Sequence, residues 1–261
     1  MSDSRVVVIT GASAGIGAAL ATQLGARGDQ VVLAARRESE LNEVAARIGA
    51  GAIAVPTDVT RRGDVDQLRD QAIKRFGHVD VWVNNAGRGI SKSVIDLTDD
   101  EFDAIMAVNV KSALYGMQAI VPHFVERGRG HLINVSSFLS RVPMATIRSA
   151  YSAAKAALNT LTANLRVDLA AVHPNIHVTL VMPGIVTTDF HRNAIGGTSG
   201  LPPMRTGFPA GQSADEVAAA IVGVIDRPVA EIYTSPAHPA IARRYFEDVG
   251  AFEREQMTAN R

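Results

Sequence analysis

The sequence predicts one doubly wound α/β domain, with a mostly parallel, seven-stranded sheet covered by helices on both faces. Short runs rich in β-branched residues alternate along the chain with longer segments of helical periodicity, which is the pattern of parallel strands joined by crossover helices. Several of these runs are apolar throughout, as expected for strands buried on both faces. The chain has 261 residues, of which 47% are hydrophobic, enough for one sizeable core.

The predicted elements follow one another in regular alternation. We expect strands at 5–10, 30–35, 52–56, 79–84, 131–135, 176–182 and 230–234. Helices are expected at 15–27, 39–49, 63–76, 99–127, 150–172 and 214–226. Two of them open with a capping-box pattern, because Thr98 and Ser213 precede Glu101 and Glu216 by three residues. We interpret 1–236 as the domain and 237–261 as its tail.

The first strand is followed directly by the glycine-rich run TGASAGIG at 10–17, which opens the first helix. This is the context of a dinucleotide-binding turn. Gly11 permits the turn, Gly15 lets the backbone approach a pyrophosphate, and Gly17 allows close packing of the helix on the sheet. The uncharged stretch 6–26 is interrupted by glycines and polar residues, so we interpret it as strand, turn and helix rather than as a membrane span or signal sequence.

The second strand ends at Ala35 and is followed by Arg36 and Arg37. A site that prefers NAD places a carboxylate here, where it accepts from both ribose hydroxyls. That carboxylate is missing, and a guanidinium can bind a 2′-phosphate through two hydrogen bonds. The sequence therefore predicts NADP(H), with Arg36 as the main contact and Arg37 as a secondary one. The alternative is that both arginines are solvated residues at the start of the next helix.

Tyr151 and Lys155 lie four residues apart in the run SAYSAAKAAL. In a helix this spacing places a phenol and an ammonium on one face, one turn apart. A free phenol has a pKa near about 10, and a nearby cation lowers it by favouring the phenolate. The pair predicts a proton donor near neutral pH, with a surface lysine beside a packing tyrosine as the alternative.

These motifs occur together with NNAG at 84–87, a serine pair at 136–137 and PGIVTT at 183–188. In combination they resemble the compact, single-domain branch of the short-chain dehydrogenase/reductase family, over about residues 5–234. The resemblance implies a Rossmann-type sheet, a nicotinamide cofactor and a catalytic tetrad. The tetrad positions in this chain are Asn109, Ser137, Tyr151 and Lys155.

The resemblance also implies a role for each residue of the tetrad. Tyr151 exchanges a proton with a substrate carbonyl or alcohol oxygen, while Lys155 lowers the tyrosine pKa and holds the cofactor ribose. Ser137 orients the carbonyl, and Asn109 positions a water. The residues expected to line the cofactor are Gly11, Ser13, Gly15, Ile16, Gly17, Arg36, Arg37, Asp58, Val59, Asn85, Ala86, Gly87, Tyr151, Lys155, Pro183, Gly184, Val186 and Thr188.

Two departures from the family pattern affect these expectations. The interval from Ser137 to Tyr151 is 151 − 137 = 14 residues, one more than is commonest in the family, so Ser136 stays open as the alternative serine. The chain also lacks the acidic-Gly-Gly segment near the C-terminus of many tetrameric members. We therefore expect a homodimer through the helix at 150–172, with the helix at 99–127 beside it and a tetramer as the alternative.

Composition excludes several classes of partner. Lys and Arg number 26 and Asp and Glu 26, so the formal net charge is zero and no global basic field attracts nucleic acid or an anionic membrane. The chain has no cysteine, which excludes disulfides and thiolate chemistry and is compatible with the cytoplasmic location that we expect. The seven histidines show no metal-ligand spacing, so no metal site is predicted.

Two segments are expected to shape the substrate site. Residues 189–212 are rich in Gly, Pro and Ser and are interpreted as a substrate loop. The tail 237–261 combines charged and apolar residues as an amphipathic helix does, and it either packs on the domain or a partner or covers the substrate. The apolar residues expected beside the site are Phe138, Leu139, Met144, Ile185 and Phe190.

The leading function is an NADP(H)-dependent carbonyl reductase or alcohol dehydrogenase that acts on an apolar small molecule. One alternative is an NAD-dependent nucleotide-sugar epimerase or dehydratase, which uses the same Tyr and Lys. Relatives of that kind usually carry a larger C-terminal substrate domain, whereas only about 70 residues follow the Pro183–Gly184 pair. The other alternative is a non-catalytic dinucleotide-binding scaffold.

Overall fold

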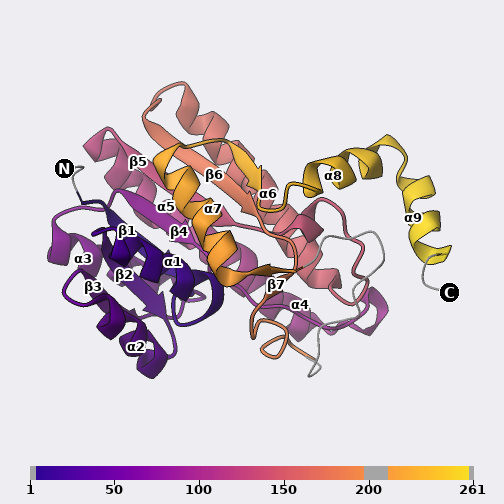
Figure 1. Cartoon of the computed structure of the whole chain (residues 1–261), viewed down its shortest axis with the longest axis horizontal. Helices are drawn as coiled ribbons and strands as arrows, with labels where there is room; N and C mark the ends of the chain where they lie inside the picture. The colour runs from indigo at the N-terminus through magenta and orange to yellow at the C-terminus, as the bar shows by residue number, and fades with distance from the viewer. Residues whose placement is uncertain (1–3, 197–210, 259–261) are drawn as a thin grey trace.

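The central element of the fold is a seven-stranded parallel sheet with strand order β3-β2-β1-β4-β5-β6-β9. The computed structural model describes residues 4–196 and 211–258. The strands of the sheet are β1 (Val6–Thr10), β2 (Gln30–Ala35), β3 (Ala52–Pro56), β4 (Val81–Asn84), β5 (Gly130–Val135), β6 (Ile176–Met182) and β9 (Glu231–Tyr233). This sheet, with helices around it, confirms the predicted doubly wound Rossmann-type fold (Figure 1).

Three helices cover each face of the sheet. Alternate residues of β1 point to opposite faces, so Val7 and Ile9 join one apolar cluster while Val6 and Val8 join the other. Figure 1 shows α1 and α7 side by side in front of the sheet. The helices of this face are α1 (Gly15–Ala26), α2 (Glu38–Ile48) and α7 (Ala214–Asp226), and those of the opposite face are α3 (Arg62–Phe76), α5 (Ser112–Arg127) and α6 (Ser149–Ala170).

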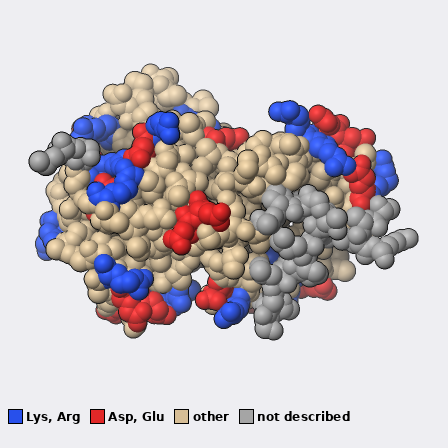
Figure 2. Space-filling view, viewed as in Figure 1, with Lys and Arg blue, Asp and Glu red and all other residues tan. Residues whose placement is uncertain are grey.

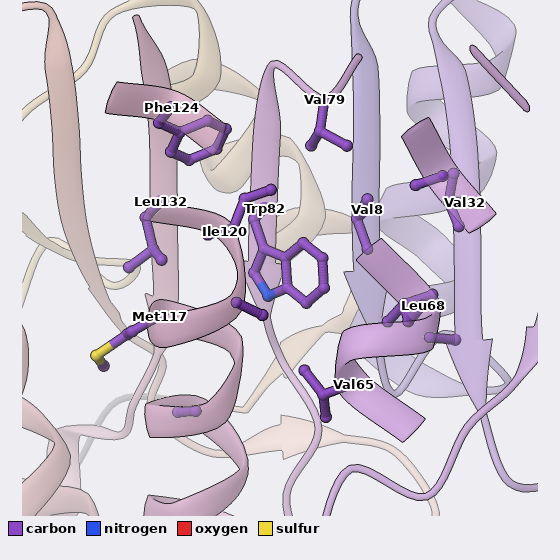
Figure 3. Packing of buried hydrophobic residues seen from close by; sticks show 14 of the residues in the cluster. Val8, Val32, Val65, Leu68, Val79, Trp82, Met117, Ile120, Phe124 and Leu132 are labelled. Carbon is purple, nitrogen blue, oxygen red and sulfur yellow. The ribbon is translucent and has the colours of Figure 1, made fainter. Parts of the chain in front are cut away.

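The core under α3 and α5 is centred on Trp82 of β4, which is fully buried among Val8, Leu68 and Ile120 (Figure 3). Its indole Nε1 donates to Asn84 Oδ1 over 2.8 Å. Such a buried polar group is stable because it is hydrogen-bonded. This bond orients the Asn84 side chain at the end of β4.

The hydrogen-bond chain continues from Asn84 across the sheet. Asn84 Nδ2 donates to Asn134 Oδ1 over 2.9 Å, and Asn134 Nδ2 donates to Thr162 Oγ1 over 2.9 Å. Thr162 belongs to α6, so these hydrogen bonds fix this helix against β5. Asn84 therefore braces the sheet rather than facing a ligand.

The helix predicted at 99–127 is interrupted. It consists of α4 (Asp99–Met106), a π-helical segment η2 (Ala107–Lys111) and α5. The sequence pattern predicts one continuous helix over this stretch, and π segments often mark functional positions. Both predicted capping boxes, at Thr98 and at Ser213, are confirmed.

The stretch Asp99–Arg127 is also the one helix, within the described part of the chain, that is long and apolar enough to cross a membrane by length and composition. Half of its apolar window is buried inside the protein. Ala113, Met117, Ile120 and Phe124 of this stretch belong to the core beside the sheet. Packing in the core therefore accounts for its hydropathy.

The C-terminal tail forms two helices, α8 (His238–Glu247) and α9 (Val249–Thr258), where one had been predicted. Asp248 separates them because it adopts an extended conformation. Tyr245 and Phe252 pack with Phe138 and Val142, in the segment that follows β5. The tail thus lies next to the serine pair, and it reaches beyond α6 at the end of the molecule opposite the N-terminus (Figure 1).

Shorter elements complete the fold around the strand ends. Most of the predicted substrate loop, 197–210, lies outside the described residues. The part that precedes it pairs Ile195 with Ile90 in a parallel bridge. The short elements are β7 (Val186–Thr187), β8 (Gln212–Ser213), which pairs with β7, η1 (Val94–Asp96) and η3 (Phe138–Ser140).

Charged residues of both signs are scattered over the face shown in Figure 2, and most of that surface carries neither sign. Several of the charges are paired with one another, as in the bond of Arg27 to Asp226 at 2.9 Å. This face therefore presents no continuous basic area.

Candidate active site

A cavity of about 1180 Å³ opens at the carboxyl ends of the parallel strands, the edge at which open α/β sheets bind their ligands. It gathers nearly all of the residues predicted for the cofactor and the chemistry. Those that line it are Gly11, Ser13, Gly15, Ile16, Arg36, Arg37, Asp58, Val59, Asn85, Ala86, Gly87, Ser137, Tyr151, Lys155, Pro183, Gly184, Val186 and Thr188. Gly17 and Asn109 do not line it and lie behind its wall.

The glycine-rich turn lines the cavity with backbone atoms at Gly11 and Gly15, which carry no side chain. Gly11 and Gly15 have φ values of +69° and +55°, a conformation that side-chain-bearing residues rarely adopt. A Cβ on Gly17 would lie 2.4 Å from the Gly11 carbonyl oxygen, so a glycine is required where α1 crosses the turn. No side chain caps the N-terminus of α1 and its first turn holds no acid, which leaves its amides available to an anion such as a pyrophosphate.

Thr10 and Asn85 hold this turn against β4. Asn85 Nδ2 donates to the Thr10 carbonyl over 2.9 Å and to the Gly11 carbonyl over 3.3 Å. Thr10 Oγ1 accepts from the backbone amides of Asn85 and Ala86. The Asn85 side chain is thus engaged with the turn, and the bracing role of Thr10 was not predicted from the sequence.

The two arginines after β2 differ in their surroundings. Arg37 Nη2 donates to Ser13 Oγ over 3.0 Å, and its Nη1 pairs with Glu40 at 3.3 Å. Arg36 is exposed and forms no hydrogen bond or ion pair with the residues that the structure describes. Its guanidinium therefore keeps its donors available beside the cavity.

Asp58 lies opposite Arg36. Its Oδ1 accepts from the backbone amide of Thr60 over 3.0 Å and from the Thr60 hydroxyl over 2.7 Å. Burial opposes ionisation, but these bonds and the charge of Arg36 lower the pKa of Asp58 overall. Asp58 is therefore a carboxylate at neutral pH, able to accept a hydrogen bond.

Helix α6 carries Tyr151 and Lys155, both buried, into the cavity. Burial raises the pKa of Tyr151 to about 12, against the opposing effects of a hydrogen bond with Ser137 and of the Arg148 charge. Burial also lowers the pKa of Lys155 to about 8. The tyrosine is thus protonated at neutral pH.

The structure shows where the Lys155 ammonium lies relative to the Tyr151 ring. Lys155 Nζ donates to the Val135 carbonyl over 2.9 Å and lies 5.8 Å from the centre of the Tyr151 ring. The ammonium is held at the end of β5, and Ser137 and Arg148 favour ionisation of the phenol.

The two serines after β5 have different partners. The Ser136 hydroxyl donates to Asn159 Oδ1 over 2.6 Å and is buried under α6. Ser137 favours ionisation of Tyr151 and accepts from the Leu139 amide over 3.2 Å. Both serines line the cavity, but the Ser136 hydroxyl is engaged by Asn159, whereas Ser137 lies beside Tyr151 and favours its ionisation.

Asn109 lies in the π-helical segment, behind Gly87 and Arg88. Its Nδ2 donates to the carbonyl oxygens of Arg88 and Ile105 over 2.9 and 3.0 Å. A Cβ on Gly87 would lie 2.8 Å from Asn109 Oδ1. In this structure Asn109 therefore fixes the segment that follows β4.

Several residues of the cavity wall were not predicted: Arg148, His191, Ser235 and His238. His238, from the start of α8, stacks on Phe138 with ring centres 4.0 Å apart. A Cβ on Gly184 would lie 2.4 Å from its Cε1, so the glycine makes room for the imidazole. Burial lowers the pKa of His238 to about 4, which keeps the ring neutral.

The described ranges contain no group of three or more His, Cys, Asp or Glu that could hold a metal ion. The polar groups of the cavity include the tyrosine, the lysine, serines and arginines, together with Asp58, Asp189, His191 and His238. This donor set suits an organic ligand with phosphate and carbonyl groups.

The chain belongs to the short-chain dehydrogenase family, whose model matches residues 5–196. It is 40% identical over 185 residues to an uncharacterized oxidoreductase of Staphylococcus aureus strain N315, which covers 70% of this chain and 79% of that protein. These matches and the fold make the protein an oxidoreductase of this family.

Solved structures of the family resemble the whole chain. A short-chain dehydrogenase/reductase from Burkholderia phymatum in complex with NAD has a TM-score of 0.84 at 27% identity, covering 95% of each chain. A short-chain dehydrogenase from Sphingobium yanoikuyae in complex with NADPH has a TM-score of 0.78 at 27% identity, covering 98% of this chain and 96% of that one. Nicotinamide dinucleotides of both kinds therefore occur among its structural neighbours.

Proposed function

We propose that the protein is an NADP(H)-dependent oxidoreductase that transfers a hydride between nicotinamide and a carbonyl or secondary alcohol group of a small molecule. The observation that carries this proposal is the meeting of Tyr151, Ser137 and Lys155 in the same cavity as the glycine-rich turn and Arg36. When bound, the nicotinamide supplies the hydride chemistry.

The residues of the chain handle the proton and the developing charge. In reduction, the Tyr151 hydroxyl gives its proton to the carbonyl oxygen as the carbonyl carbon gains a hydride, so an alcohol is formed. The hydrogen bond from Ser137 stabilises the negative charge that develops on that oxygen. Because the pKa of Tyr151 is raised to about 12, the residue holds the proton at neutral pH and has it available for carbonyl reduction.

Turnover by a Tyr151→Phe variant tests this assignment. The variant should bind NADPH as the parent does, because only the ionisable oxygen is removed, and should lose most of its turnover on a panel of ketones and aldehydes. Turnover within about tenfold of the parent would contradict the acid-base role. A parent that binds NADPH and reduces nothing on the panel would favour the non-catalytic scaffold.

The preference for NADP(H) rests on Arg36, because the neighbours bind both kinds of cofactor. Its guanidinium has no partner in the described part of the chain, Ala35 supplies no carboxylate, and Arg37 is engaged by Glu40. A 2′-phosphate beside Arg36 would therefore meet an available donor and no repelling acid at the end of β2.

Binding of NADPH and NADH, followed by cofactor fluorescence, tests this preference. Loss of a charged hydrogen bond costs about 1.5–3 kcal/mol, or roughly ten- to a hundredfold in affinity. Arg36→Ala should weaken NADPH by that amount and leave NADH nearly unchanged, while Arg37→Ala should have a smaller effect. Equal affinities of the parent for the two cofactors would overturn the assignment.

We also propose a homodimer through α6, with α4 and α5 beside it. Val167 of α6 is 72% exposed and Phe102 of α4 is 41% exposed, and the small residues of α6 permit close approach of a second helix. Light scattering should show a dimer at micromolar concentration, and Val167→Asp should shift it toward monomer. A monomeric parent would refute the proposal.

A further inference from the structure

Arg148 is a buried arginine in the wall of the active-site cavity, three residues before Tyr151. Its side chain is 5% exposed. Nη1 donates to the Ile90 carbonyl over 2.9 Å, and Nη2 donates to His191 Nδ1 over 2.7 Å. Both acceptors are neutral, and no carboxylate within 4–196 and 211–258 pairs with this guanidinium.

His191 orients the guanidinium without neutralising it. A ring nitrogen can accept a hydrogen bond only when it carries no proton, so the bond requires a neutral imidazole protonated at Nε2. Burial, together with the charge of Arg148, lowers the pKa of His191 and keeps it in that state. The positive charge of Arg148 is therefore fixed in place and uncompensated.

The other charged groups around this arginine do not compensate it either. Asp189 pairs with Arg192 at 3.3 Å, and Glu101 pairs with Lys92 at 2.8 Å. Arg88, on the segment after β4, adds a further cation and donates to a backbone carbonyl. The described neighbourhood therefore carries an excess of positive charge.

The position of Arg148 on its helix makes this charge more unfavourable. It is the N-cap residue of the 22-residue helix α6, whose first turn contains no acid. The N-terminus of a helix carries a partial positive charge, which repels cations and attracts anions. Burial of a charge without a counter-ion is costly, and burial accordingly lowers the pKa of Arg148.

The hydrogen bonds of Arg148 do not by themselves require a charge. A neutral amide could donate to the Ile90 carbonyl equally well, and that bond is enough to tie α6 to the segment after β4. What these hydrogen bonds do not supply is a counter-ion for the positive charge. An anion on the substrate would supply one.

We propose that Arg148 binds a carboxylate of the substrate, so that the enzyme acts on an oxo acid or the corresponding hydroxy acid. This inference rests on the proposed hydride transfer at the same site. His191 accepts from Arg148 and its neighbour Phe190 packs on Tyr151, so a carboxylate bound by Arg148 lies near the carbonyl that faces Tyr151. A single guanidinium matches a carboxylate in charge and in its two-pronged geometry.

The rest of the substrate faces apolar side chains. Phe190 packs edge-on against Tyr151 with ring centres 5.5 Å apart, and Leu139 and Ile147 also line the cavity. The apolar substrate expected from the sequence is thereby refined to one with an apolar body and an acidic end.

Two kinds of probe separate charge recognition from a structural role. With NADPH, 3-oxohexanoate and its methyl ester offer the same ketone with and without a carboxylate. Hexanoate and hexyl phosphate, which have no reducible carbonyl, measure anion binding to the NADPH-loaded protein through cofactor fluorescence. The variants are Arg148→Gln, which keeps a donor for Ile90, Arg148→Lys, which keeps the charge, and Arg129→Gln, a control at the opposite end of β5.

The parent should prefer the oxo acid to its ester by at least about tenfold in kcat/KM. Arg148→Gln should raise KM for the acid about ten- to a hundredfold and change KM for the ester less than about twofold. Arg148→Lys should recover part of the loss, and Arg129→Gln should behave as the parent does. Hexanoate should bind the parent, and Arg148→Gln should abolish that binding.

Three results would overturn the proposal: an equal loss on both ketones in Arg148→Gln, equal use of acid and ester by the parent, or binding of hexyl phosphate but not of hexanoate. Binding of hexanoate that depends on Arg148, in a protein that reduces no ketone, would support the anion site and refute the proposed hydride transfer. The two ideas can thus fail separately.

Discussion

Replacement of the two neighbouring serines, one at a time, should separate stability from activity. Ser136 and Ser137 are both buried, yet Ser136 donates to Asn159 while Ser137 acts on the Tyr151 phenol, whose pKa it lowers. Ser136→Ala should therefore act on the free energy of unfolding and Ser137→Ala on turnover. The two substitutions remove the same atom from adjacent positions, so each is the matched control of the other.

The magnitudes follow from what each hydroxyl contacts. Ser136→Ala leaves the buried Asn159 Oδ1 without its donor at 2.6 Å, which costs about 1–3 kcal/mol. For a chain of this size that lowers Tm by roughly 2–12 °C. Ser137→Ala removes a donor to the oxygen that develops negative charge, a loss that typically lowers kcat about 10²- to 10³-fold.

Thermal unfolding and steady-state kinetics with NADPH and a reducible ketone measure the two effects. We expect the Tm of Ser137→Ala to stay within about 2 °C of the parent and kcat of Ser136→Ala to stay within about tenfold. A larger loss of kcat in Ser136→Ala than in Ser137→Ala would refute the reasoning. It would show that Ser136, and not Ser137, is the serine that acts with Tyr151 in the working enzyme.

Two further predictions concern stability. Gly17→Ala places a Cβ 2.4 Å from the Gly11 carbonyl oxygen and should lower the free energy of unfolding by about 1–3 kcal/mol. Gly223→Ala in α7 meets no atom within 4 Å and should raise it by about 0.5–1 kcal/mol. Thermal unfolding should show Tm shifts of opposite sign for the two variants. Burial lowers the pKa of His131 to about 3 and that of His238 to about 4. Below about pH 6.5 the unfolded chain therefore binds more protons than the folded one. As the pH falls below that value, the free energy of unfolding should decrease by up to about 1.4 kcal/mol per pH unit for each histidine. Urea unfolding between pH 4.5 and 7.5 measures this change of the free energy of unfolding with pH, and His238→Phe should reduce it. An unchanged pH dependence in His238→Phe would show that His238 does not contribute to it.

The sheet and the main helices were predictable because strands buried on both faces are apolar throughout and the helices between them show helical periodicity. The strand expected at 79–84 starts at Val81 in the structure, since the Val79 amide donates to His123 instead. The break at Ala107–Lys111 was not predictable, because the apolar pattern runs through it. The two tail helices were also missed, since their separation depends on the extended backbone of Asp248.

The candidate site was predictable where motifs are local and not where it is assembled by the fold. The spacing of Tyr151 and Lys155 indicated their shared helix face, but the degree of burial that sets the pKa of each residue is a property of the folded chain. Arg148 and His191 are 43 positions apart, and no sequence pattern links them. Nothing in the sequence distinguishes His238 from the histidines outside the cavity.

The proposed pairing of Arg148 with a substrate carboxylate has a consequence for the proton on Tyr151. The charge of Arg148 favours ionisation of the phenol, so a bound carboxylate offsets that effect and helps Tyr151 keep its proton until the carbonyl oxygen takes it. Oxidation of a neutral alcohol, in contrast, requires Tyr151 to accept a proton and benefits from the unpaired cation. Arg148→Gln should therefore move the pH profile for oxidation of methyl 3-hydroxyhexanoate toward higher pH, while the rate of ester reduction at neutral pH changes little. An oxidation profile identical to that of the parent would show that Arg148 does not act on the phenol.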